Sequence, residues 1–113
     1  MFNLKEGKWH PLTERLSRWA RIQLLRVLID EMDRREIAEV CNVTVQAISN
    51  WIHKRNNHPS DETSGTLLKL VLDKKPQKVE EIIRTDIERY FEELKEIGIT
   101  ISQVNGNLVV RQK

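Results

Sequence analysis

Residues 45–50 of this 113-residue chain carry side chains that can make directed contacts with nucleic-acid bases. Gln46 and Asn50 bear amide groups that can donate to and accept from adenine at the same time, and Val45 can contact the methyl group of thymine. Ser49 supplies a hydroxyl in the same stretch. Each good amide–base pair contributes about 1–3 kcal/mol of discrimination between bases. Reading bases in this way requires a helix that turns these four side chains outward.

The charges around these residues suit a partner with a phosphate backbone. No acidic residue occurs from Cys41 to Ser60, whereas Lys54 and Arg55 fall within that segment. The net charge is only +2, but residues 1–60 carry ten Lys or Arg against seven acids, and residues 61–113 carry nine against ten. Phosphates repel carboxylates, so this gap is the electrostatic pattern expected at a nucleic-acid contact.

Two short helices that meet at a sharp turn would position these side chains. Apolar residues repeat at helical spacing on both sides of a break at Val43. The predicted inner residues are Ile37, Val40 and Cys41 before the break, and Ile48, Trp51 and Ile52 after it. Ala38 is small where the two helix axes would cross. The opposite side of the second helix is then polar and free of acids.

Capping residues define where these helices begin and end. Asp33 and Glu36 form a capping box that starts the first helix at about residue 34. Asn42 falls at the turn and tolerates a left-handed backbone better than most residues. Thr44 can cap the second helix, which we expect to span residues 45–55.

The segment resembles the helix-turn-helix of the Cro and phage-repressor (XRE-type) family. That family has an Ile-Ala pair, a Gly-Val turn, Ser or Thr, and then Val-Ser-x-Trp near the end of its recognition helix. The corresponding residues here are Ile37-Ala38, Asn42-Val43, Thr44 and Ile48-Ser49-Asn50-Trp51. Asn42 departs from the usual glycine, and the resemblance covers about half of the chain. It implies that Val45, Gln46, Ser49 and Asn50 face the major groove of double-stranded DNA.

Residues that flank the second helix are candidates for contact with DNA phosphates. The resemblance places Arg34 and Arg35 near a DNA strand, although a purely solvent-facing role is an alternative for both. Thr44 can bond a phosphate as well as cap its helix. Lys54, Arg55 and Asn57 could hold phosphates from the polar loop that follows the second helix.

Two further helices are expected to complete the core of this part of the chain. One runs from a cap at Thr13 to about residue 32 and carries a wide apolar stripe. Its four arginines are interpreted as a solvated face; they are Arg15, Arg18, Arg21 and Arg26. The other helix covers about residues 60–73. Residues 1–11 are interpreted either as a basic arm or as a segment whose Trp9 packs on the core.

The C-terminal third has a different character. Apolar residues in the predicted helix 77–97 recur in steps of four and three, the spacing of a helix that packs along another helix. The same segment carries seven acids against four Lys or Arg, so it should face away from DNA. Asn105-Gly106 predicts a hairpin over residues 99–112. The predicted dimerisation residues are Ile83, Ile87, Tyr90, Leu94, Ile97, Ile101 and Val110.

We therefore expect a mainly α fold, a helix-turn-helix bundle with a long C-terminal helix and a β-hairpin. Residues 1–75 would form the DNA-binding domain, and residues 76–113 the dimerisation element. No apolar run is long enough to cross a membrane, and no signal peptide is recognised at the N-terminus, so a cytoplasmic location is expected. No catalytic constellation, cofactor motif or metal-ligand spacing is recognised, so an enzyme is not expected.

Two functions fit these features. The first is a small homodimeric transcriptional regulator that binds specific double-stranded DNA sites. The second is a non-catalytic assembly protein, such as a partition, antitoxin or replication accessory factor, whose C-terminal element binds another protein. The two differ in whether the chain alone binds specific duplexes as a homodimer.

Overall fold

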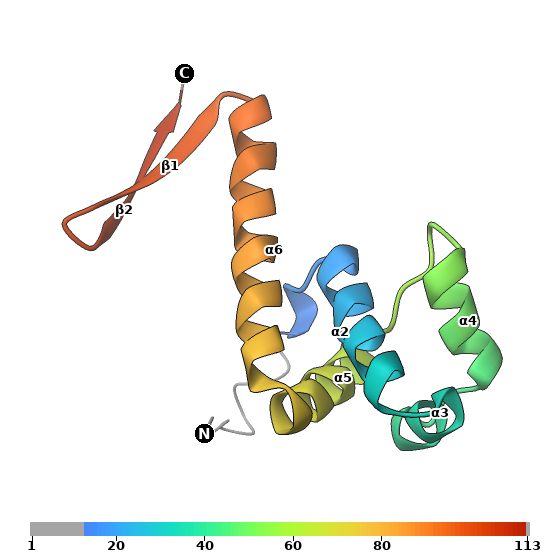
Figure 1. Cartoon of the computed structure of the whole chain (residues 1–113). Coiled ribbons are helices and arrows are strands. Elements are labelled where there is room, and N and C mark those ends of the chain that lie inside the picture. The colour runs from blue at the N-terminus through green and yellow to red at the C-terminus, as the bar shows by residue number, and fades with distance from the viewer. Residues whose placement is uncertain (1–12, 113) are drawn as a thin grey trace.

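A computed structural model describes residues 13–112 and contains, over that range, five helices followed by a hairpin (Figure 1). The elements are α2 (Arg18–Glu31), α3 (Arg34–Cys41), α4 (Val45–His53), α5 (Asp61–Lys74), α6 (Pro76–Glu96), β1 (Ile99–Val104) and β2 (Asn107–Gln112). The predicted mainly α fold with a C-terminal hairpin is confirmed. The N-terminal arm expected at residues 1–11 lies outside the described residues.

The turn between α3 and α4 forms as its residues predict. Asn42 ends α3 in the left-handed region, with φ 55°. The Val43 amide donates to the Ala38 carbonyl oxygen at 2.9 Å, which closes the end of α3. Thr44 then caps α4, because its hydroxyl accepts the Ala47 amide at 3.0 Å. The chain therefore reverses within a few residues.

The core lies between α2, α3, α5 and the first half of α6, and α4 contributes Ile48 and Trp51 to it. The prediction that Val40 faces inward is wrong, since this side chain is 52% exposed. The buried side of α3 is centred among Ile37, Ala38 and Cys41, and Val40 points about 100° away from it around the helix.

The predicted start of the first long helix at Thr13 is also wrong. α2 begins at Arg18, and Ser17 caps it by accepting the Ala20 amide at 3.0 Å. Thr13 is instead fully buried, and its carbonyl oxygen accepts the Leu16 amide at 3.2 Å. Serine and threonine are both preferred helix caps, so the presence of Thr13 alone did not fix the start of the helix.

The four arginines expected on a solvated face divide into two pairs. Arg15 and Arg26 are exposed, as predicted, whereas Arg18 is half-buried and Arg21 is only 4% exposed. Arg21 donates to three backbone carbonyl oxygens at 2.9–3.0 Å and pairs with Asp61 at 2.8 Å. The prediction failed for these two because the fold brings backbone carbonyl groups together at their guanidinium groups, and several of these carbonyl groups are more than 30 residues away in the sequence.

The first half of α6 packs on the bundle and its second half extends beyond it (Figure 1). Pro76 begins α6, as predicted, and Val79 and Ile82 are buried against α2 and α5. The hairpin follows with the predicted register, in which Ile101 lies opposite Val110. Asn105 and Gly106 take φ values of 53° and 81°, as a type I′ turn requires.

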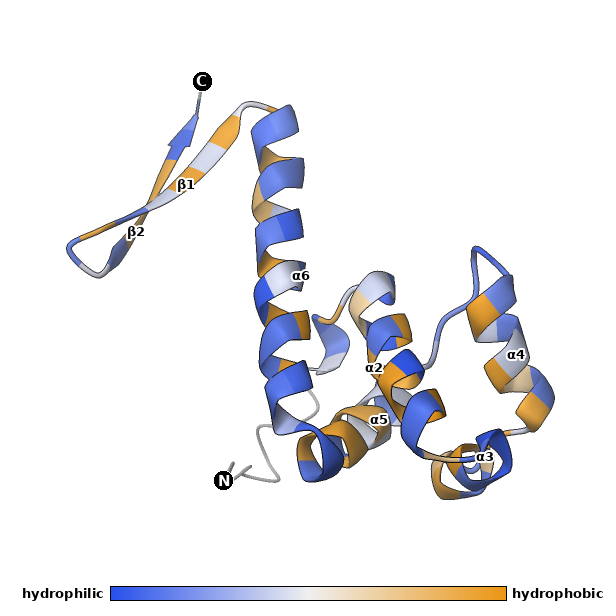
Figure 2. Ribbon diagram, in the orientation of Figure 1, coloured by the Kyte–Doolittle hydropathy of each residue, from blue (hydrophilic) through white to orange (hydrophobic). Residues whose placement is uncertain are grey.

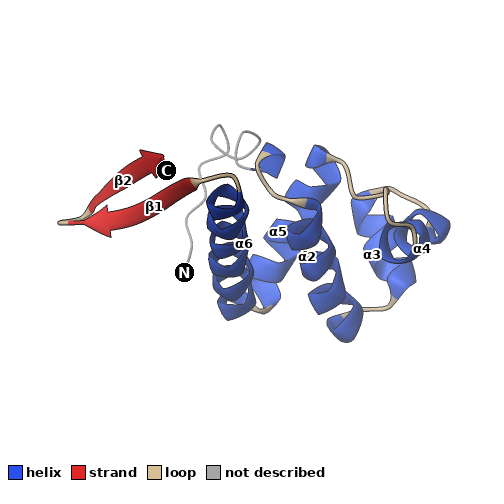
Figure 3. Ribbon diagram, turned by 90° about the horizontal axis from the view of Figure 1, so that it is seen from above, coloured by secondary structure: helices blue, strands red, loops and turns tan. Residues whose placement is uncertain are grey.

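The resulting molecule is elongated. Its principal extents are 48 × 33 × 24 Å, and its radius of gyration of 15.9 Å exceeds the value of about 13 Å for a compact domain of 100 residues. Seen from above, α6 and the hairpin lie on one side of α2, and α3 and α4 lie on the other (Figure 3). None of the described helices combines the length and apolar character that crossing a membrane requires.

Candidate nucleic-acid interface

The outer side of α4 carries the side chains that the sequence assigned to base contacts. Val45 is 42% exposed and Gln46 is exposed, whereas Ser49 and Asn50 are half-buried. The inner side of the same helix buries Ile48 and Trp51. The periodicity therefore correctly separated the inner from the outer positions of this helix.

Gln46 and Asn50 are joined by a hydrogen bond. The Gln46 Nε2 donates to Asn50 Oδ1 at 3.0 Å, across one turn of α4. This bond leaves the Gln46 oxygen as an acceptor and the Asn50 amide nitrogen as a donor. An acceptor and a donor held side by side match what adenine presents in the major groove, an amino group beside a ring nitrogen.

The candidate phosphate-binding residues lie at the ends of the two motif helices. Arg34 is half-buried and Arg35 is exposed at the start of α3. Thr44 is exposed at the start of α4, where it acts as the cap. Lys54 and Arg55 are exposed directly after α4. Lys54 and Arg55 therefore place two exposed cations at the C-terminal end of α4.

Asn57 also lies in the loop after α4, where it is half-buried. Its carbonyl oxygen accepts a hydrogen bond from Arg18 Nε at 2.9 Å. Arg18 also donates through Nη2 to the carbonyl oxygens of Lys54 at 3.1 Å and Trp51 at 3.2 Å. Sequence analysis missed this role of Arg18, because nothing in the local pattern distinguishes it from the exposed Arg15 and Arg26.

No described segment covers the outer side of α4. The acidic helix α6 and the hairpin lie beyond α2 on the other side of the bundle (Figures 1 and 3). The acid-free segment 41–60 comprises α4 and the loops at its two ends. The nearest acids in the sequence are Glu39 before this segment and Asp61 after it, and both are exposed.

A second surface combines the C-terminal half of α6 with the hairpin. Of the residues assigned to dimerisation, Ile87, Tyr90, Ile97 and Val110 are exposed, and Ile83, Leu94 and Ile101 are half-buried. Leu108 on the hairpin is exposed as well. Figure 2 shows hydrophobic residues on the strands, well outside the bundle. We call this set of residues the C-terminal apolar surface.

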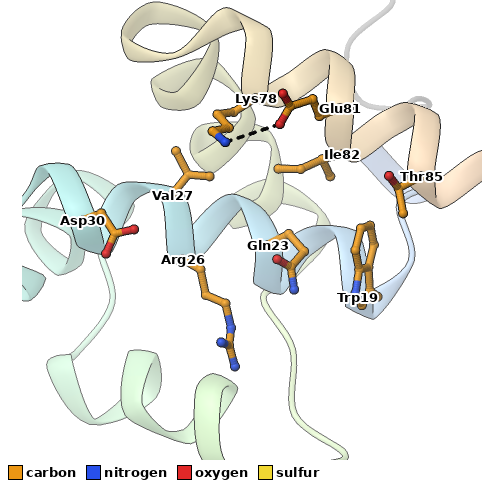
Figure 4. Close-up of a pocket in the computed structure, with 9 residues that line it drawn as sticks. All are labelled: Trp19, Gln23, Arg26, Val27, Asp30, Lys78, Glu81, Ile82 and Thr85. Atoms are coloured by element: carbon orange, nitrogen blue, oxygen red, sulfur yellow. Dashed lines mark hydrogen bonds and ion pairs between the residues drawn. The ribbon is translucent and has the colours of Figure 1, made fainter.

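A pocket of about 340 Å³ lies between α2 and α6 (Figure 4). Trp19 and Thr85 line one end of it, and the Lys78–Glu81 ion pair, at 3.4 Å, lines the other. Figure 4 shows the Arg26 side chain pointing away from α6. The charged groups do not converge on one point, so this pocket lacks the set of directed contacts that fixes a ligand.

Cys41 is half-buried at the end of α3, and burial raises the pKa of its thiol above the ordinary value. Burial therefore favours the thiol over the thiolate, which is the reactive form. Between residues 13 and 112, no three His, Cys, Asp or Glu side chains gather in a group that could hold a metal ion.

Comparison with known proteins finds no matching family model, curated protein or solved structure. The resemblance to the Cro and phage-repressor family therefore stays a prediction that depends on residues 37–51. The geometry of α3, the turn and α4 is independent of that resemblance.

Proposed function

We propose that this chain is a sequence-specific double-stranded DNA-binding protein that reads bases through α4. The observation that carries the proposal is the outer side of this helix, where the joined Gln46 and Asn50 amides lie within a segment free of acids. Val45 adds an apolar contact suited to the thymine methyl group. The buried Ile48 and Trp51 keep the helix attached to the bundle while its outer side meets the groove.

Phosphate contacts would fix the protein on the duplex. Arg34 and Arg35 at the start of α3, together with Thr44 at the start of α4, supply donors on one side of the reading helix. Lys54, Arg55 and Asn57 supply donors on the other side. Contacts of this kind set the register and orientation of the protein without selecting a sequence.

The protein acts as a homodimer in this proposal. One helix reads only a few base pairs, and two copies related by a two-fold axis place their helices in successive major grooves about 34 Å apart. The C-terminal apolar surface would join the copies. Its two parts also have opposite charge, since α6 carries seven acids against four Lys or Arg, and residues 97–112 carry Arg111 and no acid. A hairpin of one copy would therefore lie favourably on α6 of the other.

Such a dimer would serve as a small, non-catalytic transcriptional regulator in the cytoplasm. A selection of bound duplexes from a random pool tests the proposal. We expect one enriched motif with two-fold symmetry, and a complex of two chains per duplex by sedimentation. A pool that shows no enrichment after repeated rounds would rule out sequence-specific binding.

The exposed C-terminal apolar surface favours a second candidate, an assembly protein of the partition, antitoxin or replication accessory type. Ile97 is 72% exposed and Leu108 is 67% exposed, and large apolar patches mark interaction surfaces. In this case a different protein covers the surface. A purified chain that sediments as a monomer and binds no specific duplex would favour this candidate over the first.

A further inference from the structure

Arg18 holds the C-terminal end of the reading helix. Its guanidinium group donates to the carbonyl oxygens of Trp51, Lys54 and Asn57 at 2.9–3.2 Å. The carbonyl groups in the last turn of a helix have no partner within the helix, and a cation at that end is favoured by the helix dipole. A planar guanidinium with five N–H groups in fixed directions also sets the angles between its acceptors.

The three acceptors belong to the segment proposed to meet DNA. Trp51 lies in α4 itself, and Lys54 and Asn57 enclose the exposed Arg55 in the following loop. Trp51 attaches the last turn of α4 to the core, but residues 54–57 beyond it are mostly exposed, so few packing contacts restrain this loop. The side chain of Arg18 therefore determines how the chain leaves α4.

Contacts between α6 and the two residues beside Arg18 fix the position of Arg18. Ser17, the preceding residue, donates its amide at 3.3 Å and its hydroxyl to the carboxylate of Asp86. Trp19, the following residue, lies under the guanidinium of Arg89, 4.9 Å from the ring centroid. Two neighbours of Arg18 thus contact α6, while Arg18 itself contacts the end of α4.

We infer that Arg18 is a positioning residue that holds α4 and the loop 54–57 at a fixed orientation relative to α6. The functional consequence, better discrimination between DNA sites, rests on the proposed DNA-binding function. Arg18 acts through backbone carbonyl groups and need not touch DNA. Its loss loosens the reading helix, so that correct and incorrect sites are bound more alike.

Hydrogen exchange measured at individual backbone amides of the full chain tests whether Arg18 restrains α4 and the loop 54–57. The Lys54 amide donates to the Asn50 carbonyl at 2.8 Å, and the Asn57 amide donates to the Lys54 carbonyl at 3.1 Å. In Arg18→Gln we expect both amides to exchange about tenfold faster, with the amides of α5 unchanged. Arg26→Gln removes the same charge from an exposed position of α2 and is expected to change neither.

Two results would overturn the inference. Unchanged exchange at Lys54 and Asn57 in Arg18→Gln would mean that these hydrogen bonds do not restrain the loop. Faster exchange by the same factor throughout α2 and α5 would mean that Arg18 supports the whole fold and has no particular role at α4.

DNA binding supplies a separate readout. In Arg18→Gln we expect the ratio of affinities for the selected duplex and a random duplex to fall about tenfold, and in Arg26→Gln the ratio should stay constant. An equal loss for both duplexes in Arg18→Gln would overturn the positioning role. If the wild-type chain prefers no duplex, the DNA-binding function fails, and the exchange result still decides whether Arg18 holds α4.

Discussion

The guanidinium of Arg21 makes hydrogen bonds to backbone carbonyl groups at one end of the bundle, in place of water. It satisfies the carbonyl oxygens of Thr13, Leu16 and Pro59 from within α2. Its ion pair with Asp61 adds less, because the Asp61 side chain is half exposed to solvent. The stabilisation therefore comes chiefly from hydrogen bonds made by a buried charge.

We expect Arg21→Met to lower the free energy of unfolding by about 3 kcal/mol, because it removes three hydrogen bonds from a buried charged group to backbone carbonyl oxygens. Urea denaturation measures the change. Arg26→Met, at an exposed position of the same helix, should stay within about 0.5 kcal/mol of wild type. A loss at Arg21 no larger than at Arg26 would contradict this account.

The Gln46–Asn50 pair supports a prediction about specificity. Gln46→Ala and Asn50→Ala should each reduce discrimination between the selected site and a mismatched one by about 1–3 kcal/mol. The double variant should lose less than the sum, because either single change already breaks their shared hydrogen bond. Titration of both duplexes measures these losses, with urea midpoints as the control for folding. Site preference that survives both changes would show that other residues read the bases.

Residue-level predictions succeeded where a local rule decides the conformation. Asn42 takes the left-handed backbone, Thr44 caps α4, and Asn105-Gly106 forms the turn. The roles of Arg18 and Arg21 could not be predicted, because their acceptors lie 33–39 residues away for Arg18 and include Pro59, 38 residues away, for Arg21. Only the folded chain brings those carbonyl groups together.

At the scale of elements, the junction between α2 and α6 joins the bundle to the C-terminal helix. Val79 and Ile82 supply its apolar part, and Ser17 and Asp86 close one end of it. The Asp86 carboxylate also lies at the N-terminal end of α2, where the helix dipole favours a negative charge.

Asp86→Ala should lower the free energy of unfolding by about 1.5 kcal/mol, since it removes a charged acceptor of two hydrogen bonds from Ser17. Glu88→Ala, which removes an exposed acid from the same helix, should have little effect. Thermal or urea unfolding of both variants provides the comparison. If both variants lose the same free energy of unfolding, Asp86 has no particular role at the junction.

The elements themselves could largely be predicted from apolar periodicity, caps and the hairpin turn. The start of α2 could not, because Thr13 and Ser17 are both residues that cap helices, and the bond of Ser17 to Asp86, far along the chain, is visible only in the folded structure. The candidate interface was predicted as one side of α4, since burial of Ile48 and Trp51 determines which side faces outward. Its attachment to α2 through Arg18 depends on tertiary structure alone.

At the scale of the whole molecule, the proposed DNA contact and the proposed dimer contact lie on opposite sides of α2 (Figure 3). A chain cut after residue 75, at the predicted domain boundary, would test dimerisation only if residues up to 75 contained the whole core. The structure makes that cut unsuitable, because Val79 and Ile82 beyond it are part of the core.

Substitution on the C-terminal apolar surface tests the same idea without opening the core. We expect Ile97→Glu combined with Leu108→Glu to convert the dimer to a monomer, because each carboxylate would lose water on association. Sedimentation gives the mass, and a helical circular dichroism signal equal to that of the wild-type chain shows that the bundle stays folded. His53→Glu combined with Asn56→Glu, at two exposed positions outside this surface, is the matched control for the two added charges. A double variant that still sediments as two chains would place the dimer contact elsewhere.

The hairpin has two strands, and the outer edge of each strand leaves backbone N–H and C=O groups without a neighbouring strand. Any extended backbone can add to such an edge. If two hairpins paired through one edge each, the other edge of both would stay open, and further chains could add to form fibres. A finite assembly therefore requires that the free edge be covered, and a helix of the second copy packed across it would limit the assembly to two chains.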